Sequence, residues 1–146
     1  CAFCNAAATA IDGSSVFGVG TPGGVMYSLN RSTGKINWQS PVLDGIHYQS
    51  TSTANGVVYT VDGNGFLDAW DAASGKSLLR HQTASDTGGV LTAGSPTSNG
   101  IAIAEHTVLL AIPSTTGGLL ATLGSAAGAA LPPGQGAFLI AYRLPS

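Results

Sequence analysis

Apolar and polar residues alternate in short runs along most of this chain, and turn-forming residues separate the runs. In one run, Val57, Tyr59 and Val61 fall on one face of an expected strand, because side chains of a strand point alternately to its two faces. Val58 and Thr60 fall on the other face. Both faces are apolar or small, so the pattern predicts a strand that is covered on both sides, as in sheets stacked face to face.

The same reading predicts successive units of four short antiparallel strands, joined by turns rich in Gly, Asn, Asp and Ser. In the first unit the expected strands lie near residues 6–11, 15–19, 24–29 and 35–39. In the second unit they lie near residues 47–53, 57–61, 65–70 and 76–81. A third unit is expected to open near residues 90–96 and 100–111 and to close with a strand over 137–145.

An internal repeat supports these units. Residues 28–38 return in altered form at residues 69–79, which places Gly34 and Gly75 41 residues apart. A repeat of this period is typical of arrays in which similar sheets stack on one another.

Two weaker echoes extend the repeat into the third unit. The turn signal Asn55-Gly56 returns 44 residues later as Asn99-Gly100, and residues 66–71 resemble residues 138–143. These echoes predict three repeats, over residues 1–43, 44–86 and 87–146. The third is interrupted by an uncharged, Ala/Gly-rich insert at residues 112–136.

Composition narrows the class of protein. The 146 residues include 5 basic and 7 acidic side chains, for a formal net charge of −2, and 21 glycines. Without a basic stripe, nucleic-acid binding has no electrostatic basis. No apolar run is long enough to span a bilayer. Abundant turn formers and short apolar runs predict an all-β chain of many short strands.

Cys1 and Cys4 are the only cysteines in the chain. Two sulfurs cannot complete a four-ligand zinc site, and no βαβ pattern follows the Cys-x-x-Cys spacing. A local disulfide and two unpaired thiols are the favoured alternatives. A lipid-modified Cys1 is a third, although no flexible tether separates it from the first expected strand. The chain does not begin with Met, and we expect it to be a piece or a processed form of a longer protein.

Several short motifs are interpreted as turns. Gly18–Gly23 fits a dinucleotide-binding pattern, but Pro22 and then a strand follow it where a helix is required. Ser32–Lys35 fits a serine-acylase pattern, but its copy in the second repeat has lost the serine. Asp62–Gly65 lacks the further acids of a calcium loop.

The histidines His47, His81 and His106 lie in different repeats, and we expect them at surfaces or edges. No catalytic set and no metal-ligand set can be assembled from the sequence.

The repeated segment resembles the tryptophan-docking motif of the PQQ-type β-propeller repeat. The motif residues are Ser28, Asn30, Gly34 and Trp38 in the first copy and Ala69, Asp71, Gly75 and Leu79 in the second. In that family the tryptophan of one blade packs on the small residue and the turn of the next blade. The resemblance implies that Leu79 keeps the packing but loses the indole hydrogen bond.

The resemblance implies a partial β-propeller of about three four-stranded antiparallel blades. Three blades make only an arc, so the remaining blades of a longer parent protein, or other chains, are expected to complete the ring.

Two functions are compatible with this resemblance. In the first, the chain is the C-terminal arc of a secreted or periplasmic PQQ-dependent alcohol dehydrogenase of the polyvinyl-alcohol type. Such a parent protein would carry PQQ and Ca²⁺. The alternative is a non-catalytic propeller that binds other proteins, such as an outer-membrane assembly lipoprotein. For neither function does the resemblance assign a catalytic or cofactor-binding residue to a position of this chain. By itself the chain is expected to hold no cofactor and to be inactive.

Overall fold

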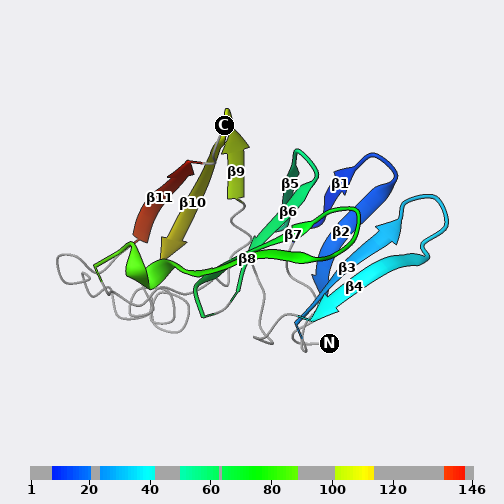
Figure 1. Cartoon of the computed structure of the whole chain (residues 1–146), viewed down its shortest axis with the longest axis horizontal. Helices are drawn as coiled ribbons and strands as arrows, with labels where there is room; N and C mark the ends of the chain where they lie inside the picture. The colour runs from blue at the N-terminus through cyan, green and yellow to red at the C-terminus, as the bar shows by residue number, and fades with distance from the viewer. Residues whose placement is uncertain are drawn as a thin grey trace, which may run out of the picture.

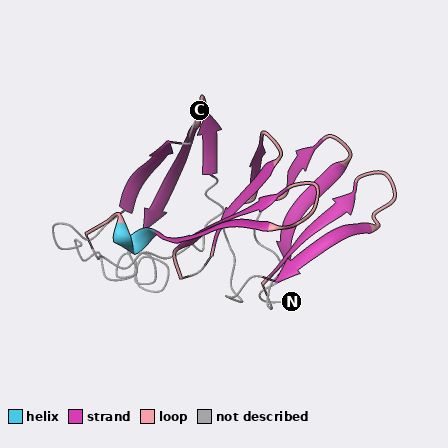
Figure 2. Ribbon diagram, viewed as in Figure 1, coloured by secondary structure: helices cyan, strands magenta, loops and turns pink. Residues whose placement is uncertain are grey.

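The structure is a computed structural model. It describes residues 8–20, 24–41, 50–62, 64–88, 101–113 and 137–143. Figure 1 shows these residues as three sheets that fan side by side, and Figure 2 shows that strands dominate them. The helical element among the described residues is one short 3₁₀ turn, η1 (Thr83–Ser85).

The strands form three antiparallel sheets, which we call blades 1, 2 and 3. Blade 1 contains, in order, β1 (Ala10–Asp12), β2 (Ser15–Gly20), β3 (Val25–Asn30) and β4 (Ile36–Pro41). Blade 2 contains β5 (Ser52–Ala54), β6 (Val57–Val61), β7 (Phe66–Asp71) and β8 (Ser77–Gln82). Blade 3 contains β9 (Ile101–Ala104), β10 (Thr107–Pro113) and β11 (Ala137–Arg143). The predicted all-β, partial-propeller fold is confirmed.

The first strand of each blade lies next to the first strand of its neighbour. Strand β5 contacts both β1 and β9. The backbone N–H of Thr51 donates to the carbonyl of Ala8 at 3.0 Å, and the hydroxyl of Ser52 donates to the carbonyl of Ile101 at 2.6 Å. These contacts set β1, β5 and β9 in a row along which successive blades are stacked.

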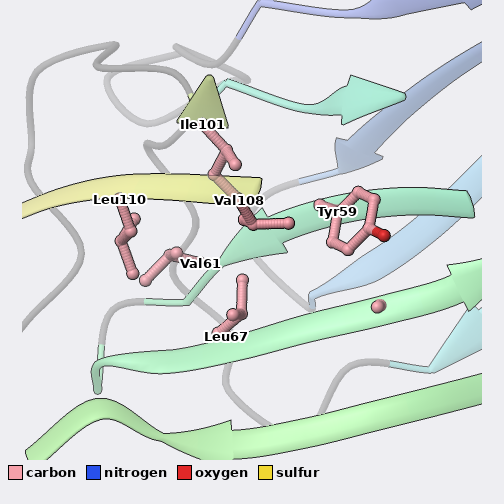
Figure 3. Close-up of a cluster of buried hydrophobic side chains, with 7 residues drawn as sticks. Tyr59, Val61, Leu67, Ile101, Val108 and Leu110 are labelled. Carbon is pink, nitrogen blue, oxygen red and sulfur yellow. The ribbon is translucent and has the colours of Figure 1, made fainter. Parts of the chain in front are cut away.

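Apolar side chains fill both junctions between blades. Between blades 1 and 2 the buried cluster consists of Phe17, Val19, Met26, Val58 and Trp70. Between blades 2 and 3 it consists of Tyr59, Val61, Leu67, Ala69, Ile101, Val108 and Leu110, most of which are labelled in Figure 3. Each middle strand of blade 2 alternates between the two clusters, since Val58 and Trp70 face blade 1, whereas Tyr59 and Ala69 face blade 3. This alternation is the reason why both faces of β6 are apolar.

The alignment of the third repeat differs from the prediction. Ser52 pairs with Tyr59 in blade 2, and Ala102 pairs with Leu109 in blade 3, so β9 corresponds to β5 and β10 to β6. The turn equivalent to Asn55-Gly56 is therefore Glu105-His106, and the prediction of one strand over residues 100–111 is wrong. Both residues have positive φ, 45° and 64°, as Asn55 and Gly56 have 51° and 74°.

The error has a physical cause. Asn-Gly strongly favours a two-residue hairpin turn with positive φ, whereas Glu-His does not, so the Asn99-Gly100 signal pointed to the wrong place. Because β9 takes the first-strand position, it replaces the strand expected at residues 90–96 for that role. Residues 89–100 lie outside the described residues.

The last strand agrees with the weaker echo. Arg143 pairs with Thr107 as Asp71 pairs with Val57, so β11 corresponds to β7. Blade 3 thus has three strands among the described residues, where blades 1 and 2 have four. The expected insert at residues 112–136 overlaps β10, which extends to Pro113; residues 114–136 lie outside the described residues. The predicted repeat boundaries at residues 43/44 and 86/87 stay predictions.

Candidate interblade docking site

The turn between the third and fourth strands is built in the same way in blades 1 and 2. In blade 1, Oδ1 of Asn30 accepts hydrogen bonds from the backbone N–H groups of Ser32 and Thr33, each at 3.0 Å. In blade 2, Oδ1 of Asp71 accepts from the backbone N–H of Ser74 at 2.7 Å and from its hydroxyl at 2.6 Å. Such side-chain to backbone bonds are the reason that Asn and Asp favour turns.

These hydrogen bonds lower the pKa of Asp71. The hydroxyl of Ser74 contributes most, and the backbone N–H of Ser74 comes next, because both stabilise the charged carboxylate. Asp71 is therefore ionised at neutral pH, whereas Asn30 closes the same turn without a charge.

Both turns end on a glycine with positive φ, +68° at Gly34 and +73° at Gly75. A side chain is strained in this region, so glycine is preferred there. At position 75, glycine is required for a second reason. A Cβ atom there would lie 2.6 Å from two ring carbons of Trp38, so only glycine leaves room for the indole.

Trp38 of β4 joins blade 1 to blade 2. Its indole Nε1–H donates to the carbonyl of Ala72 at 2.8 Å, and its ring lies over Gly75. The ring of Phe17 lies behind it, with ring centroids 5.9 Å apart. A large aromatic side chain thus packs on the backbone of the next blade and satisfies its polar group at the same time.

The other motif residues take different places. Ser28 is fully buried and pairs with Trp38 across the strands of its own blade. Ala69 packs in the cluster between blades 2 and 3, so the small residue that Trp38 meets in blade 2 is Ala72. Leu79 occupies the position of Trp38 in β8 and is 41% exposed.

A polar cluster joins blades 2 and 3. Oδ2 of Asp86 accepts a hydrogen bond from the hydroxyl of Tyr142 at 2.7 Å and lies 2.7 Å from Nε2 of His81. The rings of His81 and Tyr142 meet edge to face, with their centroids 5.6 Å apart.

The contacts within this cluster shift the pKa values of its members. The hydrogen bond from Tyr142, followed by that of His81, lowers the pKa of Asp86. Burial, with Asp86 next, raises the pKa of Tyr142. Sequence reasoning placed His81 at an edge and missed this cluster, because Asp86 and Tyr142 are 56 residues apart.

Blade 2 also contains a buried ion-pair network that sequence reasoning missed. Arg80 Nη1 donates to both carboxylate oxygens of Asp68 at 3.0 Å, and Nη2 donates to Asp62 at 2.9 Å. Both carboxylates are buried, and the guanidinium lies 4.1 Å from the ring centroid of Phe66. Oδ1 of Asp62 caps the turn that follows β6, which agrees with interpreting this segment as a hairpin turn. Asp68, an acid within an otherwise largely apolar strand, was the available signal, because a buried charge needs a partner.

The opposite face of blade 1 has a hollow of about 300 Å³. Its lining is largely apolar and includes Val16, Gly18, Tyr27, Leu29 and Ile36. Ile36 is 56% exposed, and a Cβ atom at Gly34 would meet no atom within 4 Å. The Gly34 turn of blade 1 is therefore not covered by any described residue, whereas Trp38 covers the equivalent Gly75 turn of blade 2.

The described residues do not fit a calcium ion or PQQ. They contain no group of three or more His, Cys, Asp or Glu side chains that could hold a metal ion. The hollow in blade 1 has no charged side chain in its lining, whereas Asp62 and Asp68 are bound to Arg80. A polyanionic quinone with its cation would need charged ligands that these residues do not offer. Cys1, Cys4 and His47 lie outside the described residues.

No helix in the part of the chain that the structure describes has the length and hydrophobicity needed to cross a membrane.

The fold and the interblade contacts define a β-propeller segment built from PQQ-type repeats. Residues 4–131 match the sequence model of the family described as "Outer membrane protein assembly factor BamB", and the chain belongs to this family. No curated protein sequence matches the chain.

Solved structures with similar folds include a computationally designed protein, Ika4, with 10% identity and a TM-score of 0.59; the match covers 94% of this chain and 64% of Ika4. Quinohemoprotein alcohol dehydrogenase from Comamonas testosteroni is similar at 16% identity and a TM-score of 0.59, over 76% of this chain and 17% of that one. BamB from Moraxella catarrhalis is similar at 16% identity and a TM-score of 0.54, over 75% of this chain and 30% of that one. The chain thus spans less than two thirds of each of these proteins, and the likenesses show the fold.

Proposed function

We propose that this chain is an arc of a larger PQQ-type propeller that works as a non-catalytic protein-binding scaffold. The match of residues 4–131 to the family of an outer membrane assembly factor carries this proposal. The chemistry of the described residues supports it, since the aromatic, acidic and cationic groups named above bind one another across and within blades. On this proposal the parent protein acts outside the cytoplasm, in the periplasm or beyond it.

Further blades of the parent are proposed to pack on the face of blade 1 that no described residue covers. Gly34 and the carbonyl of Arg31 are the counterparts of Gly75 and the carbonyl of Ala72. A preceding blade would place an aromatic side chain of its fourth strand on Gly34, as Trp38 lies on Gly75.

A second candidate function is that of a PQQ-dependent alcohol dehydrogenase. The similarity to the quinohemoprotein alcohol dehydrogenase and to a europium-containing methanol dehydrogenase, with a TM-score of 0.57, favours it. On this alternative, PQQ and Ca²⁺ would be held by parts of the parent other than the described residues.

One experiment distinguishes the two candidates. The parent protein is purified, supplied with PQQ and Ca²⁺, and assayed for cofactor absorbance and for reduction of a dye with an alcohol as substrate. The scaffold proposal expects neither signal, and it is overturned if both appear. This chain alone is expected to give no activity on either candidate.

A further inference from the structure

Asparagine followed by glycine is prone to spontaneous deamidation, because glycine has no side chain to hinder the attack of its backbone nitrogen on the asparagine amide. Three such pairs occur in the chain, Asn55-Gly56, Asn64-Gly65 and Asn99-Gly100. The first two lie in the turns at the two ends of β6, and the third lies outside the described residues. Two pairs with the same two residues can thus be compared within one blade.

The reacting groups of Asn55-Gly56 are accessible. Both residues are exposed, and they form the two-residue turn between β5 and β6 with positive φ. The side-chain amide of Asn55 and the backbone N–H of Gly56 make no hydrogen bond with any residue that the structure describes. The nitrogen that attacks and the carbon that is attacked are therefore both available in the folded chain.

In Asn64-Gly65 the equivalent groups are held in place. Gly65 is buried, and its backbone N–H donates to the carbonyl of Asp62 at 3.1 Å. The carbonyl of Gly65 accepts from the backbone N–H of Thr83 at 3.1 Å and from its hydroxyl at 2.7 Å. The carbonyl of Asn64 accepts from Nε2 of Gln82 at 3.1 Å. Several of these bonds must break before the Gly65 nitrogen can react.

The Asn55-Gly56 turn also supports the contact between blades 1 and 2. The carbonyl of Gly56 accepts from the backbone N–H of Ala72 at 2.8 Å, and the carbonyl of Ala72 accepts the indole N–H of Trp38 at 2.8 Å. Two consecutive hydrogen bonds thus connect this turn to the preceding blade. A change in the position of the Gly56 carbonyl acts directly on Ala72.

We propose that Asn55 is a modification site, at which spontaneous deamidation in the folded chain forms isoaspartate and releases the backbone N–H of Ala72 from Gly56. The inference concerns the junction between two described blades. It does not depend on the proposed function.

The reaction needs no reagent other than water. The backbone nitrogen of Gly56 loses its proton to a base in solution and forms a bond to Cγ of Asn55. The bond from Cγ to the side-chain nitrogen breaks, and that nitrogen takes up a proton and leaves as ammonia. Water then opens the resulting succinimide ring at one of its two carbonyl carbons, which gives aspartate or isoaspartate.

Isoaspartate changes the length of the turn. Its main chain runs through Cβ and Cγ of the former asparagine, which adds a carbon atom between Ala54 and Gly56. A two-residue hairpin turn depends on the backbone angles of its two central residues, so the added atom displaces the Gly56 carbonyl. The backbone N–H of Ala72 then loses its acceptor.

The rate of deamidation is measured on the whole chain, incubated at mildly alkaline pH and analysed by peptide mapping with mass spectrometry. We expect Asn55 to react at least ~10-fold faster than Asn64 in the folded chain, because reaction at Asn64 requires the loss of several hydrogen bonds. In concentrated urea the two rates should become similar, because unfolding removes those bonds. A folded-state rate at Asn55 no higher than that at Asn64 would overturn the proposal.

Amide hydrogen exchange, followed by NMR on the isolated isoaspartate form, measures the structural effect. We expect the amide of Ala72 to exchange at least ~5-fold faster than in the unreacted chain. The amide of Arg31 is the internal control, because it donates at 2.8 Å to the carbonyl of Ser14 in the equivalent turn of blade 1, which contains no asparagine. If the protection of Ala72 is unchanged, the modification does not reach the docking turn, and that part of the proposal is wrong.

Two variants separate the causes. Asn55→Gly keeps a residue that adopts positive φ and removes the reactive amide, so its Ala72 amide should stay protected after the same incubation. Freshly prepared Asn55→Asp introduces the charge without lengthening the main chain, and it should also keep this protection. Loss of protection in Asn55→Asp equal to that in the isoaspartate form would show that the added carbon atom is not the cause. None of these outcomes bears on the assay of PQQ-dependent dye reduction, so the two proposals can fail separately.

Discussion

At the junction between blades 1 and 2, an indole ring lies on a glycine and donates its one hydrogen bond to a backbone carbonyl. At the junction between blades 2 and 3, the corresponding strand carries Leu79, and Asp86 links His81 to Tyr142. Both junctions also bury an apolar cluster. The Trp38 contact at the first junction has no titratable group, whereas the contact at the second junction includes the ionised carboxylate of Asp86.

Each pair of adjacent blades is therefore connected by its own type of contact in addition to the buried apolar cluster. Burial of apolar side chains drives blades together without specifying which polar groups meet. The outer contact can then be an aromatic ring in one place and a hydrogen-bonded cluster in the next. Stability at the two junctions should therefore respond differently to mutation and to pH.

Trp38→Ala is expected to have the largest effect. It removes the indole packing between two blades and leaves the carbonyl of Ala72 without its donor, at a cost of about 3–5 kcal/mol in the free energy of unfolding. Urea denaturation followed by circular dichroism measures it. A loss below about 1 kcal/mol would mean that the ring contributes little and that the two junctions do not differ in this way.

The matched pair Gly75→Ala and Gly34→Ala is expected to come next. Both residues have positive φ, so each substitution should cost about 1–2 kcal/mol in backbone strain. Gly75→Ala also places a Cβ atom against Trp38, which should add about 1–3 kcal/mol. In the Trp38→Ala background, the cost of Gly75→Ala should fall to that of Gly34→Ala. An unchanged difference would show that the indole does not lie on Gly75.

Tyr142→Phe is expected to destabilise the second junction by about 1 kcal/mol at neutral pH, because it removes the hydrogen bond to Asp86. The hydrogen bonds lower the pKa of Asp86 below its ordinary 3.8. Their stabilisation is therefore present above pH 3.8 and is lost as the pH falls below that value through the folded-state pKa. Urea titrations from pH 7 to pH 2 should show the wild-type and Tyr142→Phe stabilities converging in acid. A constant difference would contradict a role for the carboxylate charge. Trp38→Ala should show no such convergence.

Lys35→Ala is expected to have the smallest effect, below about 0.5 kcal/mol. Lys35 is an exposed side chain in the same turn as Gly34, and exposed charges contribute little to stability. Thermal melts of this variant beside Gly34→Ala separate the role of the backbone in this turn from that of its charge. A loss comparable to that of Gly34→Ala would mean that Lys35 makes a contact of its own.

Much of the fold could be predicted because its signals are local. Alternating faces and turn residues predicted the second, third and fourth strands of blades 1 and 2, and Asn30, Asp71, Gly34 and Gly75 have chemistry that a tight turn requires. The first strands, expected near residues 6–11 and 47–53, begin later, at Ala10 and Ser52. In the third repeat, the Asn99-Gly100 signal misled because Glu105-His106 forms a turn that its residues do not favour. Turn propensity is a local preference, and strand pairing overrode it there.

The polar clusters could not be predicted, since their members come from distant positions. Nothing near Tyr142 in the sequence indicates Asp86, and nothing near Arg80 indicates that it serves both Asp62 and Asp68. Only the stacking of strands and blades decides which buried polar groups meet.

The amino-acid sequence by itself determined the repeating sheets, their turns and the two-sided apolar strands, because strand periodicity and turn geometry depend on near neighbours. The tertiary structure decided which polar and aromatic side chains connect adjacent blades, and which strands of the third repeat correspond to those of the second. Those features depend on register and on contacts between residues far apart in the chain, and no single segment carries that information.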